Sequence, residues 1–423
     1  MRKIKVSKYS LIIIMLLMEL LYDTEFLYLV RVRHVYAVIF TILFMSVFYF
    51  VFFKNIHQME KRAKGLFKEC YTFIICYIIL FIYSSIKYTN QSFADTLIGE
   101  NESYSLLFIV IAIPIITLIY HNKGNRELLK FLNGFALAVC ILEIMQVIVH
   151  KRMGVIFLTR YFEGRNIGYR SYGLRIILHW SGNFMTLYNF YMFYNIRAKK
   201  KGKWIKYFLF FVIMMFDQIV VSQTRQTLLI LAGCFILQIL LDRNSRWGLQ
   251  KKILVSISII VFVCIGGYIP DFINSFSASS DLAVSTTERL YSYQYYWNYF
   301  LRHPIFGFGF ANPQINTSIV KGPLGRAIVD DVGIVGHLAK EGIFVVPMYI
   351  IPMIRCITIL CRANRNKKIP DLPYYWAALF FVIAGSATQI VLDQERILLF
   401  PIVLGMIEYI NIAVKNNLII SEL

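Results

Sequence analysis

Four arginines recur at intervals of five residues in the stretch TRYFEGRNIGYRSYGLR, residues 159–175. They are Arg160, Arg165, Arg170 and Arg175, and glycines and tyrosines lie between them. Guanidinium groups bind phosphate or carboxylate through two parallel hydrogen bonds, and glycine lets the backbone approach an anion closely. A step of five residues turns an α-helix by about 140°, so these arginines form no single helical stripe. We interpret the stretch as a glycine-broken loop or short interfacial helices that bind an anionic ligand. The alternative is that the arginines meet lipid headgroups.

Arg225 is a second candidate for chemistry, in the motif SQTRQTLLILAG at residues 222–233. A cation at membrane depth is costly unless it reaches water or has a partner. Asp217, near the end of the preceding apolar run, could be that partner. The alternative is that both runs face a polar cavity that is open to the outside.

A third candidate is the segment TTERLYSYQYYWNYFLRHPIFGFGF, residues 286–310. It joins Glu288 and Arg289 to an aromatic-rich amphipathic run that ends in a His-Pro turn and Gly-Phe-Gly. Aromatic faces with polar rims suit sugar rings. The alternative is an interfacial helix whose tyrosines lie at the membrane surface.

The composition shows which architecture must position these residues. The chain has 423 residues, of which 58% are hydrophobic and 16% charged, and its long apolar runs have no polar face. This excludes a soluble multidomain enzyme. The seven cysteines form no CxxC pair and the seven histidines no HxxxH or HExxH motif, so we predict no metal site and no cofactor.

The apolar runs predict an all-α integral membrane protein with about 12 transmembrane helices and two large extracytoplasmic loops. The predicted spans are residues 9–22, 35–53, 70–87, 104–120, 131–149, 178–196, 207–222, 225–241, 253–269, 343–361, 374–392 and 396–414. Lys and Arg concentrate at the N-terminus and in alternate loops, such as KNIHQMEKRAKGLFK and RAKKKGKWIK. The positive-inside rule places these loops in the cytoplasm, and an even number of spans then places both termini there too.

This topology divides the chain into five parts. Residues 1–149 hold transmembrane helices 1–5, and residues 150–177 form the basic extracytoplasmic loop. Residues 178–269 hold helices 6–9, residues 270–342 form the large extracytoplasmic loop, and residues 343–423 hold helices 10–12 and the cytoplasmic C-terminus. The orientation rule disfavours Lys and Arg in an outer loop, so the charge of the first loop favours a functional explanation.

Three motifs, in this order, resemble the O-antigen ligase and Wzy-type polysaccharide polymerase superfamily. They are SQTRQTLLILAG, then TTERL with YYWNYFLRHPIFGFGF, and then DDVGIVGHLAKEGIF before the next span. The resemblance covers residues 205–360. It implies a GT-C-like, metal-independent glycosyltransferase that acts at the outer face of a bacterial cytoplasmic membrane. Its substrate would be an oligosaccharide linked to undecaprenyl pyrophosphate, an anion at the surface where the basic loop is expected.

The resemblance also suggests roles for single residues. By position, two arginines that engage the pyrophosphate in the family correspond to Arg225 and Arg289. The ligases carry a His followed, after Asn, Ser or Gln and nine more residues, by Gly. Counting back from Gly342 reaches Asp331, so an acid replaces the usual His, and this departure counts against a strict ligase.

Asp331 or Glu288 could orient or deprotonate the acceptor hydroxyl, and His337 is a further candidate base. The alternatives are that Asp330 and Asp331 cap the following helix and that His337 is structural.

We therefore expect a polymerase that joins undecaprenyl-pyrophosphate-linked repeat units by inverting transfer, for a capsule, an O-antigen or an exopolysaccharide. An O-antigen-type glycan ligase is the nearest alternative. A lipid-linked oligosaccharide flippase is an alternative of another class, and a channel or sensor a more distant one. The expected partners are the lipid-linked oligosaccharide, membrane lipids, a chain-length regulator and a flippase, with no nucleic acid.

Overall fold

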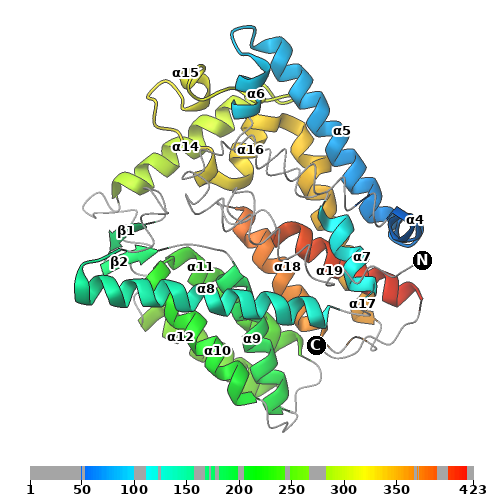
Figure 1. Ribbon diagram of the computed structural model, residues 1–423, viewed down its shortest axis with the longest axis vertical. Coiled ribbons are helices and arrows are strands. Elements are labelled where there is room, and N and C mark those ends of the chain that lie inside the picture. The colour runs from blue at the N-terminus through cyan, green and yellow to red at the C-terminus, as the bar shows by residue number, and fades with distance from the viewer. Residues whose placement is uncertain are drawn as a thin grey trace.

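The structure is a computed structural model that describes part of the chain. The described residues are 49, 53–99, 111–121, 125–156, 167–170, 173–176, 181–198, 204–242, 248–265, 283–365, 369, 371–387 and 399–416. The predicted span at residues 9–22 and nearly all of the span at residues 35–53 lie outside these ranges. Within them most of the chain is helical (Figure 1).

The helices follow the predicted apolar runs closely. The α-helices are α4 (Phe53–Arg62), α5 (Lys64–Lys87), α6 (Phe93–Gly99), α7 (Ala112–His121), α8 (Arg126–Met153), α9 (Ser181–Ala198), α10 (Trp204–Phe216), α11 (Arg225–Leu241), α12 (Leu249–Ile265), α14 (Ala283–Arg302), α15 (Thr317–Val320), α16 (Gly333–Glu341), α17 (Ile351–Arg365), α18 (Leu372–Ser386) and α19 (Leu399–Lys415). The π-helical segments are η2 (Asp217–Ser222) and η5 (Val346–Ile350), and the 3₁₀ turns are η3 (Asp330–Val332) and η4 (Gly342–Phe344).

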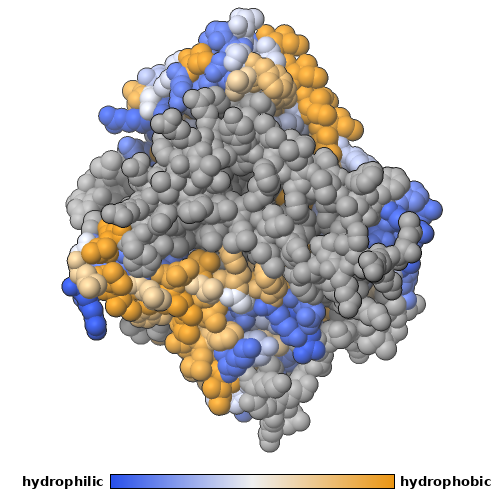
Figure 2. Space-filling model, viewed as in Figure 1, coloured by the Kyte–Doolittle hydropathy of each residue, from blue (hydrophilic) through white to orange (hydrophobic). Residues whose placement is uncertain are grey.

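Apolar side chains on the outside show that the protein belongs in a membrane. Among the described residues, four helical stretches are long and apolar enough to cross a bilayer: Lys64–Lys87, Arg126–Met153, Trp204–Ser222 and Val346–Arg365. On α5 an exposed isoleucine stripe runs along one face, and Figure 2 shows hydrophobic residues along the visible part of this helix. A water-soluble helix would bury such a stripe. The membrane assignment is confirmed, whereas the number of twelve spans and the GT-C-like architecture stay predictions.

The centre of the bundle is formed by helices that are largely buried on every side. Helix α19 packs against α7, α17 and α18, and nearly all of its residues are buried. Helix α9 packs against α8, α10, α11 and α18. An apolar surface alone would also suit lipid, so the contacts on several sides are what place α9 and α19 in the interior.

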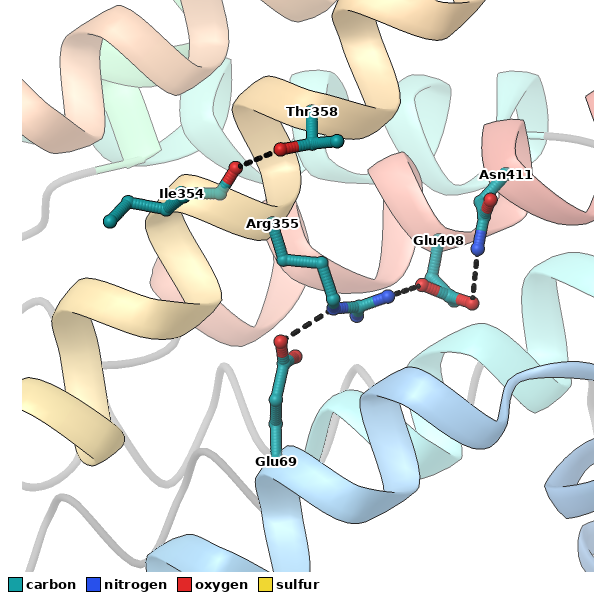
Figure 3. Close-up of polar contacts among 6 residues, drawn as sticks. All are labelled: Glu69, Ile354, Arg355, Thr358, Glu408 and Asn411. Atoms are coloured by element: carbon teal, nitrogen blue, oxygen red, sulfur yellow. Dashed lines mark hydrogen bonds and ion pairs between the residues drawn. The ribbon is translucent and has the colours of Figure 1, made fainter.

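A buried ion-pair network joins three of these helices (Figure 3). Arg355 of α17 donates through Nε to Glu69 of α5 and through Nη1 to Glu408 of α19, each at 2.5 Å. Asn411 donates a further hydrogen bond of 2.9 Å to Glu408. A Cβ atom at Gly65 would lie 2.8 Å from Arg355 Nη1, so glycine there leaves room for the guanidinium group. The network fixes α5, α17 and α19 relative to one another.

Part of the basic stretch is a β-hairpin, which corrects one expectation. Strand β1 (Ile167–Arg170) pairs with strand β2 (Gly173–Ile176) in an antiparallel ladder. Leu174 and Ile176, two residues apart, are buried against Val139 of α8 and Val221 of η2, as the period of two in a strand requires. The prediction of short interfacial helices is therefore wrong for these residues, while the described chain as a whole is predominantly α-helical, as predicted.

The segment KNIHQMEKRAKGLFK also differs from its prediction as a loop, because it forms α4 and the start of α5. Ile56 and Met59 of α4 are buried while most of its charged residues are exposed. Such an amphipathic pattern favours a helix that lies on the core.

Much of the large loop at residues 270–342 is helical and docks on the end of α5. The turn after α14 packs against the end of α16, with hydrogen bonds from Phe308 N to Ala339 O (2.8 Å) and from Gly309 N to Lys340 O (2.7 Å). Ser84 of α5 accepts a hydrogen bond of 2.7 Å from Phe310 N. Figure 1 shows α14, α15 and α16 beside α6 at this end of the molecule. These contacts hold the predicted site residues of α14 and η3 in one unit.

Candidate functional site

An ion pair joins two of the predicted site residues. Arg289 Nε, on α14, lies 3.8 Å from Asp331 Oδ2, in η3. Both side chains reach solvent, with 47% of the Arg289 side chain and 22% of the Asp331 side chain exposed. A cation that can bind phosphate and a carboxylate that can bind a hydroxyl group therefore lie together at an accessible position.

Hydrogen bonds from α14 hold the chain that leads to Asp331. Ser292 Oγ donates to Glu288 O (2.7 Å) and accepts from Ile328 N (3.1 Å). Tyr296, which is fully buried, donates from its hydroxyl group to Val320 O at 2.7 Å. Buried hydrogen bonds of this kind fix the loop against the helix. The distance between Arg289 and Asp331 is thus set by the packing of α14 on the loop.

Tyr293 is a neighbour of the pair that the sequence did not single out. Burial raises the pKa of its hydroxyl group above the ordinary value of 10.0; the Arg289 guanidinium opposes this shift, and the Asp331 carboxylate adds to it. The hydroxyl group therefore stays protonated at neutral pH and donates to Ala387 O at 2.6 Å. One helical turn separates Arg289 from Tyr293, which places an aromatic ring beside the charges. In the sequence, the spacing of four residues between Arg289 and Tyr293 could have indicated this contact.

Other tyrosines extend this aromatic surface along α14. The rings of Tyr291 and Tyr295 stack with centroids 6.2 Å apart, and Tyr295 donates to Ile319 O at 2.6 Å. Burial raises the pKa of Tyr295 to about 12 and that of Tyr299 to about 12. These tyrosines are half-buried and bonded to the protein, so α14 is more than the freely exposed interfacial helix of the alternative interpretation.

The structure also bears on Glu288 and on helix capping. Glu288 is half-buried on α14, and adjacent helical positions point about 100° apart, so it lies on a different side of the helix from Arg289.

Helix α16 begins at Gly333, and its N-cap is Val332, with no side-chain hydrogen bond at that position. Asp331 lies one residue before the N-cap position, so it does not cap the helix through that position, while an acid this close to the helix N-terminus agrees with the dipole form of the alternative.

His337 lies in the interior, paired with an acid that the sequence analysis missed. Its Nδ1 atom is 3.0 Å from Oε1 of Glu341, one turn later on α16, and both side chains are almost completely buried. The His337 ring lies 5.9 Å from that of Tyr349. In the sequence, the spacing of four residues between His337 and Glu341 could have indicated this pair. The burial agrees with the structural interpretation of His337.

Arg225 is the first residue of α11 and follows an unusual backbone segment. The π-helical segment η2 ends at Ser222, and Gln223 then adopts a left-handed conformation with φ 50°. Asp217 and Gln218 at the start of η2 are buried. The Arg225 side chain lies outside the described part of the structure, so its predicted contact with Asp217 stays a prediction.

The four arginines of the basic stretch are only partly described. Arg170 and Arg175 lie on β1 and β2, at the alternate positions to Leu174 and Ile176, and the backbone alone is described at both arginines. Arg160 and Arg165 lie outside the described residues. Strand β2 packs against η2, so the basic stretch and the segment before Arg225 are neighbours in space.

Comparison with known protein families supports this grouping of residues. Residues 210–327 match the family model described as O-antigen ligase. Over this region the chain is similar to the O-antigen ligase family. The region contains Arg225, Glu288 and Arg289, and it ends just before Asp331 and His337. The predicted resemblance is confirmed over this region. No curated protein matches the chain. Within the described residues, no group of three or more His, Cys, Asp or Glu could hold a metal ion.

Proposed function

We propose that the protein is a polysaccharide polymerase that joins oligosaccharide repeat units linked to undecaprenyl pyrophosphate. The observation that carries this proposal is the Arg289–Asp331 pair at the edge of the O-antigen ligase region. The match supports a membrane enzyme that transfers lipid-linked glycans. The acid at position 331, where the ligases carry His, favours polymerase over ligase.

The reaction requires little beyond positioning and charge stabilisation. An acceptor hydroxyl attacks the anomeric carbon of the donor sugar, the bond to the pyrophosphate oxygen breaks, and undecaprenyl pyrophosphate leaves. Arginines stabilise the charge that develops on this leaving group. Asp331 orients the hydroxyl and accepts its proton. A single displacement inverts the configuration at the anomeric carbon.

In this proposal Arg289 changes partner when the donor binds. Without donor it pairs with Asp331, at 3.8 Å and half exposed, which is a weak interaction. A pyrophosphate offers more negative charge and the geometry of a bidentate hydrogen bond. Donor binding would then draw Arg289 away from Asp331, and the Asp331 carboxylate would accept a hydrogen bond from the hydroxyl of the incoming acceptor.

The two arginines are tested by substitution. We expect Arg225→Ala and Arg289→Ala each to abolish polymer with normal amounts of protein in the membrane. Lysine at either position should restore activity only in part, because a point charge cannot reproduce the guanidinium fork. Arg160, Arg165, Arg170 and Arg175 should give graded losses, as for a surface that guides anions. Normal polymer from both alanine variants would refute the assignment.

The proposal also requires the site to lie outside the cytoplasm, with both termini inside, in a bacterial cytoplasmic membrane. Asn298 on α14 and Glu127 near the start of α8 are both exposed. In a cysteine-free protein, Asn298→Cys should react with an impermeant maleimide on intact cells. Glu127→Cys should react only after permeabilisation. The reverse pattern would place the site on the wrong side of the membrane for this substrate.

Glycan analysis of a deletion strain separates the remaining functions. Loss of a polymerase leaves single repeat units on the acceptor, whereas loss of a ligase leaves finished polymer on undecaprenyl pyrophosphate. Loss of a flippase stops both polymer and single-unit products. Accumulation of single units is the result that the proposal requires.

A further inference from the structure

A set of buried polar side chains lies beneath the basic hairpin. Glu143 of α8 and Asp217 and Gln218 of η2 are each at most 3% exposed. Strand β2 packs on both α8 and η2, and Figure 1 shows the hairpin at one end of α8. Charged groups inside a membrane protein are costly and often functional. This set therefore requires an explanation, and the site described above does not use it.

Asp217 Oδ2 accepts a hydrogen bond of 3.3 Å from Gln218 Nε2. The Asp217 carboxyl group also faces the side chains of Glu143 and Cys140 on α8. Two full negative charges side by side at this depth would repel each other and would be costly to bury. One proton held between the two carboxyl groups removes that cost, because a protonated carboxyl group can donate a hydrogen bond to a carboxylate.

Close packing holds this pair in place. A Cβ atom at Gly182 of α9 would lie 2.8 Å from Cys140 Sγ and 3.7 Å from Gln218 Nε2. Helix α9 therefore covers the pair closely at a glycine. The π-helical turn brings Gln218 and Ser222 onto one side of η2, and π-helical turns occur frequently at functional sites.

A chain of hydrogen bonds leads from Asp217 to the residue before Arg225. Gln218 Nε2 donates to Asp217 Oδ2 at 3.3 Å, and Ser222 Oγ donates to Gln218 Oε1 at 3.2 Å. Ser222 Oγ and Thr224 Oγ1 are 3.3 Å apart. Gln223 lies between these two hydroxyl groups with φ 50°, a conformation that a non-glycine residue adopts only when its surroundings enforce it.

We propose that Glu143 and Asp217 share one proton and, through this chain, position Arg225 for binding of a pyrophosphate. This inference rests on the proposed function, in which Arg225 is a pyrophosphate ligand. The carboxylate charge orients the amide group of Gln218, and the amide oxygen then holds Ser222 at the turn into α11. Gln218 also blocks proton transfer along the chain, because an amide does not readily give up one proton while accepting another. The pair is therefore a positioning device and is not the catalytic base.

The shared proton is tested by infrared spectroscopy on the purified full-length protein. A protonated carboxyl group has a carbonyl stretch that a carboxylate lacks. We expect this band in the wild type near neutral pH and its loss in both Glu143→Gln and Asp217→Asn. Glu127→Gln, an exposed acid on the same helix that pairs with Lys130, should keep the band. A band unchanged in the two pair variants would refute the shared proton.

The positioning role is tested with variants that leave both acids intact. We expect Gln218→Leu and Ser222→Ala to weaken binding of undecaprenyl pyrophosphate, measured in detergent micelles, by roughly 5- to 150-fold. The carboxyl band and the melting temperature should stay close to those of the wild type. Exchanging the two acids, Glu143→Asp with Asp217→Glu, should restore the band that either neutral variant loses.

The outcomes separate this inference from the proposed function. If Arg225→Ala weakens binding of undecaprenyl pyrophosphate and Gln218→Leu and Ser222→Ala do not, the positioning role is wrong and the function stands. If Arg225→Ala binds as well as the wild type, the pyrophosphate assignment of Arg225 is wrong, and the positioning role fails with it. Weaker binding in all three variants supports both.

Discussion

Replacing Asp331 by Asn separates a catalytic role from a structural one, because the two predict very different magnitudes. Arg289 Nε and Asp331 Oδ2 are 3.8 Å apart, and the exposed fraction is 47% for the Arg289 side chain and 22% for the Asp331 side chain. Two charges at about this distance in water interact by about 1 kcal/mol, and exposed pairs contribute about 0–1 kcal/mol to stability. The free energy of unfolding should therefore fall by at most about 1 kcal/mol.

A general base contributes far more to the rate. Its loss typically costs about 10²- to 10⁴-fold, which corresponds to roughly 2.7–5.4 kcal/mol in the activation barrier. Asn keeps the shape and hydrogen bonding of Asp and loses its basicity. We therefore expect Asp331→Asn to polymerise at least about 10²-fold more slowly while donor binding persists, at least as tight as in the wild type because Arg289 no longer has Asp331 as a competing partner.

The assay is polymerisation of a defined lipid-linked repeat unit by purified protein, with products separated as a ladder on a gel. Thermal unfolding of the same samples reports stability. Asp330→Asn is the matched control, because adjacent positions differ in direction and we expect near-normal activity from it. A fully active Asp331→Asn protein would remove Asp331 from the catalytic residues and leave Glu288 as the next acid to examine.

Three further predictions concern the frame around the site. A Cβ atom at Gly307, where φ is 60°, would lie 2.2 Å from Ala339 O, so Gly307→Ala should destabilise the protein by more than about 1 kcal/mol and lower its melting temperature. Arg355→Ala leaves two buried carboxylates without their cation and should cost about 3–5 kcal/mol in thermal unfolding, whereas replacing all three members by apolar residues should restore most of it. Hydrogen bonds from Ser92 hold the pKa of Asp95 below its ordinary value of 3.8. The stabilisation of α6 by these hydrogen bonds is therefore present above pH 3.8 and is lost as the pH falls through the lower pKa of the folded state. Hydrogen exchange of α6 should show this acid dependence, and Asp95→Asn should abolish the dependence.

The positions of many helices could be predicted from the sequence. The predicted span at residues 225–241 coincides with α11, and the span at residues 131–149 lies within α8. Apolar runs of this length are a local property, because each backbone group in a membrane helix bonds within its own segment. The motif around Arg225 is likewise a local pattern, and it lies within the region that matches the family model.

Local pattern was less informative where packing between distant segments decides the structure. Leu174 and Ile176 form part of a strand because α8 and η2 bury the face of the hairpin on which these two side chains lie. The pattern of arginines between glycines and tyrosines did not predict a strand in this stretch. Glu408 lies inside the predicted span at residues 396–414 and Glu69 lies just before the span at residues 70–87, so hydropathy gave no sign that the two acids meet. Their pairing with Arg355 depends on three helices that meet only in the folded bundle.

The sequence by itself determined that this is a membrane protein with a region similar to the O-antigen ligase family, and Arg289, Asp331 and His337 were among its candidates. Tertiary structure decided which of them meet: Arg289 and Asp331 form an accessible pair, while His337 is buried beside Glu341. The physical reason is that residue type and spacing fix the chemistry a side chain can perform. Whether it faces solvent or the core depends on how α14, η3 and α16 pack together, through contacts between residues far apart in the chain.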